Sequence, residues 1–120
     1  MRRRRETLGM LYALYHEVNQ LRFGMLLPPI FIYLNPIKRR KKDAEGAELA
    51  HTWQDDYTGQ PRAVELAEDH ALKSSWADVS ETMKHEIIHV WQCAMGWSMA
   101  HDSRFRAMAK RLGCSGRATD

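Results

Sequence analysis

Three residues within one short segment have the types and spacing of a metal-dependent hydrolase. Residues 85–89 read His-Glu-Ile-Ile-His, the pattern HExxH. On a helix, residues four positions apart lie on one face, so the imidazoles of His85 and His89 can reach the same metal ion. Glu86 is about 100° around the helix from His85, close enough to hold a metal-bound water without being a ligand. The segment therefore predicts a zinc site with Glu86 as general base.

A catalytic zinc usually has three protein ligands and one open position, so a third ligand must come from elsewhere in the chain. The longer pattern HExxHxxGxxH requires glycine and histidine where this chain has Gln92 and Met95. No glutamate follows Glu86. The remaining downstream candidates are Cys93, His101, Asp102, Cys114 and Asp120. We favour His101, because it lies beyond a predicted helix end at Gly96 and because three nitrogen ligands suit catalytic zinc.

Length and composition indicate one globular domain over residues 1–120. Apolar residues make up 44% and charged residues 28% of the chain, which are ordinary values for a folded domain. Two cysteines are too few for a disulfide framework. No segment approaches the ~18 apolar residues of a membrane span, so we expect no membrane partner.

The N-terminus superficially resembles a secretory signal, because Arg2–Arg5 precedes the apolar run Leu8–Tyr15. His16 and Glu17 end that run early. The apolar residues also recur at helical spacing, which favours an amphipathic helix. We therefore expect a cytoplasmic protein.

The elements that must position the site can be read from periodicity and from turn residues. We expect helices over residues 4–22, from 76 or 77 to 95, and from 103 or 104 to 112. We expect strands over residues 30–35, 48–54 and 63–67. The turn residues 55–59 join the last two strands as an antiparallel hairpin. The expected fold is α+β, with a small three-stranded antiparallel sheet between an N-terminal helix and the HExxH helix.

The HExxH helix has apolar residues on two sides of its histidines. On a helical wheel, His85 and His89 lie between two apolar arcs. One arc contains Val79, Met83, Ile87, Val90 and Ala94, and the other contains Ile88, Trp91 and Met95. We therefore expect this helix to pack on both sides, with its polar stripe opening into a cleft. Asp69, Asp78 and Asp102 are candidates to orient the histidine rings from behind.

The chain resembles the SprT-like (Spartan-type) zinc metalloprotease domain. The resemblance rests on His85–His89, Gly96, His101 and Phe105, and upstream on Asn19–Phe23, Leu26–Pro28, Ile30–Leu34 and Ala63–Ala67. It implies a zincin-like fold and one Zn²⁺ per chain, held by His85, His89 and His101, with Glu86 as catalytic residue. It also implies a protein or peptide substrate and, as in several members, cleavage of proteins bound or crosslinked to DNA. The family often has glycine after the third histidine, where this chain has Asp102.

Half of the basic residues lie in two short runs. The runs are Arg2, Arg3, Arg4 and Arg5, and Lys38, Arg39, Arg40, Lys41 and Lys42. They hold 9 of the 18 lysines and arginines in a chain of formal net charge +3. Such clustering is typical of contact with phosphate backbones, so we expect DNA as a partner without sequence specificity. The alternative is a solvated tail and a solvated loop that discourages edge pairing.

Two other functions fit the same residues. One is a peptidase of narrow specificity that acts on a regulator and has no DNA role. The other is a non-catalytic nucleic-acid-binding domain whose structural zinc has Cys93 or Cys114 as an additional ligand. The aromatic residues Trp53, Tyr57, Trp76 and Trp97 can stack on bases or belong to the core, and we assign them to neither.

Overall fold

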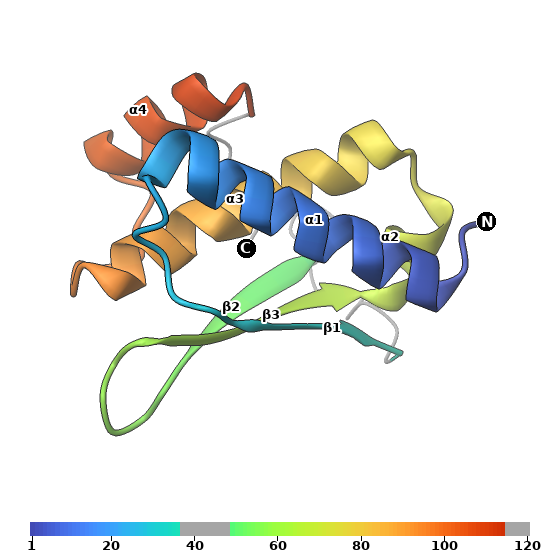
Figure 1. The fold of residues 1–120 in the computed structure, drawn as a ribbon, viewed down its shortest axis with the longest axis horizontal. Helices are drawn as coiled ribbons and strands as arrows, with labels where there is room; N and C mark the ends of the chain where they lie inside the picture. The colour runs from blue at the N-terminus through green and yellow to red at the C-terminus, as the bar shows by residue number, and fades with distance from the viewer. Residues whose placement is uncertain (37–48, 115–120) are drawn as a thin grey trace.

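The computed structural model describes residues 1–36 and 49–114. This part of the chain is α+β: four helices lie over one face of a three-stranded sheet (Figure 1). The elements are α1 (Arg4–Phe23), β1 (Phe31–Asn35), β2 (Ala50–Gln54), β3 (Pro61–Ala67), α2 (Glu68–Lys73), α3 (Trp76–Ala94) and α4 (Ser103–Leu112). None of these helices has the length and apolar character that a membrane span requires.

The sheet is mixed, with β3 in its centre and the strand order β1-β3-β2. The predicted hairpin is confirmed, because β2 pairs antiparallel to β3 with Thr52 opposite Val64. The prediction that the whole sheet is antiparallel is wrong, because β1 pairs parallel to β3 with Ile32 opposite Val64. The tight turn after β2 determines how β2 and β3 pair. No tight turn of this kind joins β1 to β3, because β2 lies between them in the sequence, so the neighbour of β1 is not specified by any local signal.

Helix α2 was not predicted from the sequence. It begins directly after β3, and Ala67 is both the last strand residue and the helix N-cap. No glycine, proline or polar cap separates the two elements, so the usual signs of a helix start are missing. Glu68 and Asp69 in its first turn and Lys73 in its last turn do follow the charge preference of a helix dipole.

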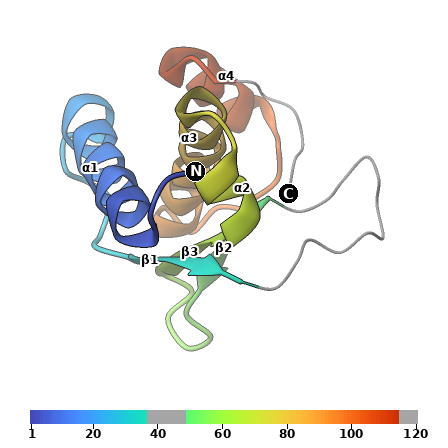
Figure 2. The same ribbon diagram turned by 90° about the vertical axis from the view of Figure 1, so that its right-hand side faces the viewer.

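The core lies between the helices and the inner face of the sheet. The inner-face residues of the strands are buried; they are Ile32, Leu34, Ala50, Thr52, Val64 and Leu66. Helix α1 contributes Leu11, Tyr15 and Val18 to the same core. Among the described residues, no helix covers the outer face of the sheet in either view (Figures 1 and 2). Phe31 and Trp53 are exposed on this face.

Helix α3 is packed on two sides, as its sequence predicted. Val79, Met83 and Ile87 on one arc are inaccessible to solvent, and so is Ile88 on the other arc. Figure 2 shows α3 between α1 and α4, above the sheet. A helix held on several sides cannot shift or rotate without opening gaps in the core, so it is a rigid support for the histidines.

The buried side-chain amide of Asn19 fixes the path of the chain between the end of α1 and β1. Gly24 adopts a left-handed conformation with φ 56°. The Asn19 side chain then donates a hydrogen bond to the carbonyl of Leu27 and accepts one from its N–H, both at 2.9 Å. Asn19 and Leu27 are both buried. One side chain thereby satisfies two backbone groups that solvent does not reach.

We predict that Asn19→Leu lowers the free energy of unfolding by about 2–4 kcal/mol, because both backbone groups of Leu27 lose their partner in a buried place. Urea denaturation at a fixed zinc concentration measures this change. Gln20→Leu, at the exposed neighbouring position, is the matched control and is expected to stay within about 0.5 kcal/mol of wild type. Equal midpoints for Asn19→Leu and wild type would contradict the assignment.

Candidate metal centre

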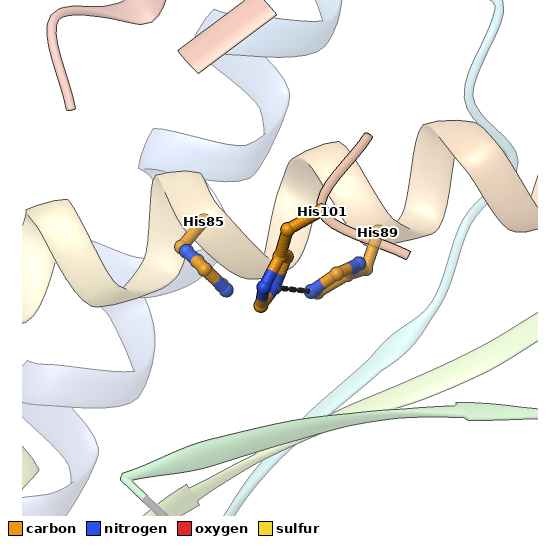
Figure 3. Close-up of side chains that lie close together, drawn as sticks. All are labelled: His85, His89 and His101. Carbon is orange, nitrogen blue, oxygen red and sulfur yellow. Dashed lines mark hydrogen bonds between the residues drawn. The ribbon is translucent and has the colours of Figure 1, made fainter. Parts of the chain in front are cut away.

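Three imidazoles from two parts of the chain meet beside α3. His85 and His89 lie on α3, and His101 lies just before α4 (Figure 3). One potential ligand atom from each ring lies within 4.8 Å of the others, and His89 Nε2 is 3.2 Å from His101 Nε2. Two nitrogens bound to one tetrahedral zinc at ~2.0–2.1 Å would be about 3.3 Å apart. The three rings therefore form a donor set that can hold a metal ion.

Helix α3 provides two of the rings in the way that the HExxH spacing predicted. Ser75 caps the helix by accepting a hydrogen bond from the N–H of Asp78. The ring centroids of His85 and His89 are 4.9 Å apart. Both residues are buried, with exposed fractions of 3% and 4%, so the histidine stripe lies inside the molecule and not on an open helix face.

The return of the chain after α3 brings the third ring to the first two. The helix ends at Ala94, and Gly96 has φ 77°. The N–H of Trp97 donates to the carbonyl of Gln92 at 2.9 Å, which reverses the chain direction. His101 follows within a few residues and faces α3. Sequence reasoning selected His101 by elimination among downstream residues, and it is the one that the structure places beside His85 and His89.

The first turn of α4 holds His101 in place. Asp102 is the N-cap of this helix, and its side chain accepts from the N–H of Phe105 at 3.0 Å. The Phe105 ring is inaccessible to solvent, and its centroid lies 4.8, 5.0 and 4.5 Å from those of His85, His89 and His101. Asp102 therefore serves to start α4.

A glutamine is hydrogen-bonded to the ring of His89, although the sequence offered only aspartates for this role. Gln92 Oε1 lies 2.9 Å from His89 Nδ1, and Gln92 is fully buried. Of the aspartates considered, Asp102 caps α4, Asp69 accepts from the N–H of His70, and Asp78 is exposed. The signal that could have found Gln92 is its position three residues after His89, on the same helix face.

The strand β2 reaches the carboxylate of Glu86. Thr52 Oγ1 donates to Glu86 Oε1 at 2.8 Å, and both residues are buried. Thr52 was not among the predicted site residues, because its pairing with α3 depends on the tertiary fold. The hydrogen bond orients the carboxylate, and it links the central helix to the edge of the sheet.

The cysteines lie apart from the imidazole group in the described residues. Cys93 Sγ donates to the carbonyl of Gly59 at 3.0 Å. Burial raises the pKa of the Cys93 thiol, and burial is also the main cause of the raised pKa of Cys114. Among the described residues, neither thiol joins the three imidazoles in a group that could hold one metal ion. This geometry speaks against a structural zinc site that combines the imidazoles with either cysteine.

The basic residues proposed for DNA contact fall into two groups. Arg2 donates to the carbonyls of Ala71 and Ser74 at 2.7 Å, so its guanidinium serves the protein itself. Arg3, Arg4 and Arg5 are exposed, and Arg4 also pairs with Glu68 at the surface. The run Lys38–Lys42 lies outside the described residues.

The unassigned aromatic residues also divide into two groups. Trp53 and Tyr57 are exposed, with fractions of 46% and 99%. The guanidinium carbon of Arg104 lies 3.9 Å from the centroid of the Trp97 ring. The guanidinium carbon of Arg2 lies 5.9 Å from the centroid of the Trp76 ring. Of the four aromatic residues, Trp53 and Tyr57 therefore offer the larger exposed surface.

Comparison with known proteins gives one match. The sequence model of the SprT-like family matches residues 11–119, which is most of the chain. No curated protein and no solved structure matches. The matched region contains α3, β2 and the segment that carries His101, so it includes the whole donor set. The chain belongs to the SprT-like family, whose members are associated with metallopeptidase-like function.

Proposed function

We propose that this protein is a zinc-dependent endopeptidase in which His85, His89 and His101 hold the metal and Glu86 is the catalytic residue. The observation that carries the proposal is the convergence of three imidazoles within 4.8 Å, next in sequence to a buried carboxylate. Three nitrogen ligands are the donor set of many catalytic zinc sites, which keep a fourth position open. Family membership supports a metallopeptidase and a protein substrate.

When bound, zinc lowers the pKa of water toward neutrality and polarises a carbonyl group. The protein supplies the proton transfer. Glu86 takes a proton from the water that attacks the peptide carbonyl and delivers it to the leaving amine as the C–N bond breaks. Thr52 keeps the carboxylate in one orientation through its hydrogen bond to Oε1. A fixed carboxylate loses less entropy at the transition state, which favours hydrolysis.

The edge of β2 is the place where we propose that an extended substrate binds. The N–H of Ala67 donates to the carbonyl of Leu49. In an antiparallel pair, hydrogen-bonded and non-hydrogen-bonded residues alternate along each strand. Thr52 is three residues after Leu49 and is therefore a non-hydrogen-bonded residue of the pair, so its N–H and carbonyl point away from β3. In the described part of the chain, no strand pairs with that side of β2. A peptide added there would bond through its backbone, close to Glu86. Recognition of this kind demands little of the substrate sequence.

We further propose that the substrates are DNA-associated proteins. The support is the concentration of 9 of 18 basic residues in two runs, together with the exposure of Arg3 and Arg5. Because Arg2 already donates to two backbone carbonyls, this proposal rests mainly on Arg3–Arg5 and Lys38–Lys42. The competing function is a peptidase that acts on one regulator without DNA.

His101→Ala is expected to weaken zinc binding by more than about 100-fold, because loss of a ligand exceeds the ~10–100-fold effect of an outer hydrogen-bond partner. Competition with a chelator at limiting free zinc measures the affinity. His16→Ala, on the exposed side of α1, is the matched control and is expected to bind like wild type. Full zinc occupancy of His101→Ala under these conditions would refute the ligand assignment.

Glu86→Gln is expected to keep zinc and the fold but to lower peptide hydrolysis by about 10²–10⁴-fold, because an amide cannot accept the proton at neutral pH. Cleavage of an unstructured protein in the presence of zinc is the assay. Glu17→Gln, at an exposed position on α1, should leave the rate unchanged. If Glu86→Gln cleaves as fast as wild type, the activity lies elsewhere.

Replacing all five residues of Lys38–Lys42 by glutamine is expected to weaken binding to every DNA sequence alike. Each lost phosphate contact should reduce the log–log salt slope by ~0.9 for duplex and ~0.7 for single strands. A salt titration of DNA binding measures both effects. The control for net charge is a variant in which five exposed basic residues elsewhere are changed to glutamine; they are Arg22, Arg62, Lys73, Lys110 and Arg111. Coinciding curves for wild type and the five-fold variant would favour the regulator-specific peptidase.

A further inference from the structure

The side chain of Gln92 joins two parts of the candidate metal centre. Its Oε1 lies 2.9 Å from His89 Nδ1, and its Nε2 donates to the carbonyl of Ala100 at 2.8 Å. Gln92 is inaccessible to solvent. We propose that Gln92 is a positioning residue that selects the metal-binding nitrogen of His89 and ties the segment carrying His101 to α3. This inference rests on the proposed zinc site.

The selection of the nitrogen follows from which groups can donate. A backbone carbonyl only accepts, so the amide NH₂ of Gln92 must face Ala100. The amide oxygen then faces His89 Nδ1, and this nitrogen must carry the hydrogen. Neutral imidazole has one N–H, so the lone pair of His89 is on Nε2. Nε2 is the atom that lies 3.2 Å from His101 Nε2, where the metal would bind.

Gln92 also bonds to both ends of the segment that returns from α3 toward α4, at Trp97 and at Ala100. The backbone carbonyl of Gln92 accepts from the N–H of Trp97, and its side chain donates to Ala100, directly before the ligand His101. On the far side, Arg106 donates to the carbonyl of His101 at 2.8 Å. The third ligand is thus placed from two directions before any metal arrives. Such preorganisation reduces the ordering cost of binding, and it should appear as metal affinity.

The two ends of the amide can be separated by substitution. Glutamate at position 92 keeps an acceptor for the N–H of His89 but has no donor for the carbonyl of Ala100. Methionine has a similar length and provides neither. The proposal therefore predicts an order of zinc affinity in which wild type exceeds Gln92→Glu and Gln92→Glu exceeds Gln92→Met. Loss of an outer hydrogen-bond partner typically costs ~10–100-fold in metal affinity, which is the range expected for Gln92→Met.

The first measurement is imidazole ¹⁵N NMR of the zinc-loaded wild-type protein. His89 is expected to carry its hydrogen on Nδ1 and to bind zinc through Nε2. The same spectrum of Gln92→Glu should keep the Nδ1 hydrogen even though the affinity falls. Zinc bound through Nδ1 of His89 in wild type would overturn the role of Gln92 but leave the proposed zinc site intact. A wild-type protein that takes up no zinc would instead overturn the proposed function.

The second measurement is zinc affinity by chelator competition for wild type and both Gln92 variants. Asn19→Leu is the matched control, because it also removes a buried amide that ties a helix to a following segment. It should lower stability but leave zinc affinity unchanged. Equal affinity for Gln92→Met and wild type would overturn the proposal, and so would an equal loss in Asn19→Leu. If Gln92→Met does not fold, the ¹⁵N spectrum of the wild type and the zinc affinity of Gln92→Glu still test the proposal.

Discussion

The placement of a third imidazole against two that lie one helical turn apart is the constraint on which this structure depends. Two histidines on α3 follow from spacing alone, but the third must come from a chain that has left the helix, reversed and returned. The turn at Gly96, the amide of Gln92 and the cap at Asp102 each contribute one step of that return. Phe105 then packs against all three rings and keeps water from one side of the cluster. The C-terminal part of the fold is therefore organised around the position of His101.

The sheet has a different task from the helices. Its inner face supports α3, and its edge strand β2 provides the hydroxyl that orients Glu86. Because Thr52 is buried in a strand and Glu86 is buried in a rigid helix, neither can move without disturbing the core. A single short strand thus connects the packing of the domain, the orientation of the carboxylate and the proposed binding of an extended substrate. Such a combination of structural and functional roles in one strand is expected in a small domain, because most of its residues are needed for packing.

The sequence predicted the parts of the molecule that depend on local signals. The two-sided packing of α3, the hairpin of β2 and β3, and the proximity of His101 to His85 and His89 all follow from periodicity, turn residues and elimination. The parallel pairing of β1, the helix α2 and the contacts of Thr52 and Gln92 were not predicted. Each of them depends on which distant segments meet, or on an element boundary without a turn signal, as at Ala67. Which aspartate orients a histidine ring stays a prediction, whereas the contact of Gln92 with His89 could not be predicted from charge, because it depends on geometry in a buried site.

We propose that three imidazoles of this chain hold one zinc ion and leave one coordination position open for a water molecule. X-ray absorption at the zinc edge of the wild-type protein tests it most directly, because it reports the type and number of atoms bound to the metal. We expect three nitrogen ligands and one oxygen ligand at ~2.0–2.1 Å. A sulfur ligand at ~2.3 Å would show that Cys93 or Cys114 takes part and that the site is of another kind, and it would contradict the claim.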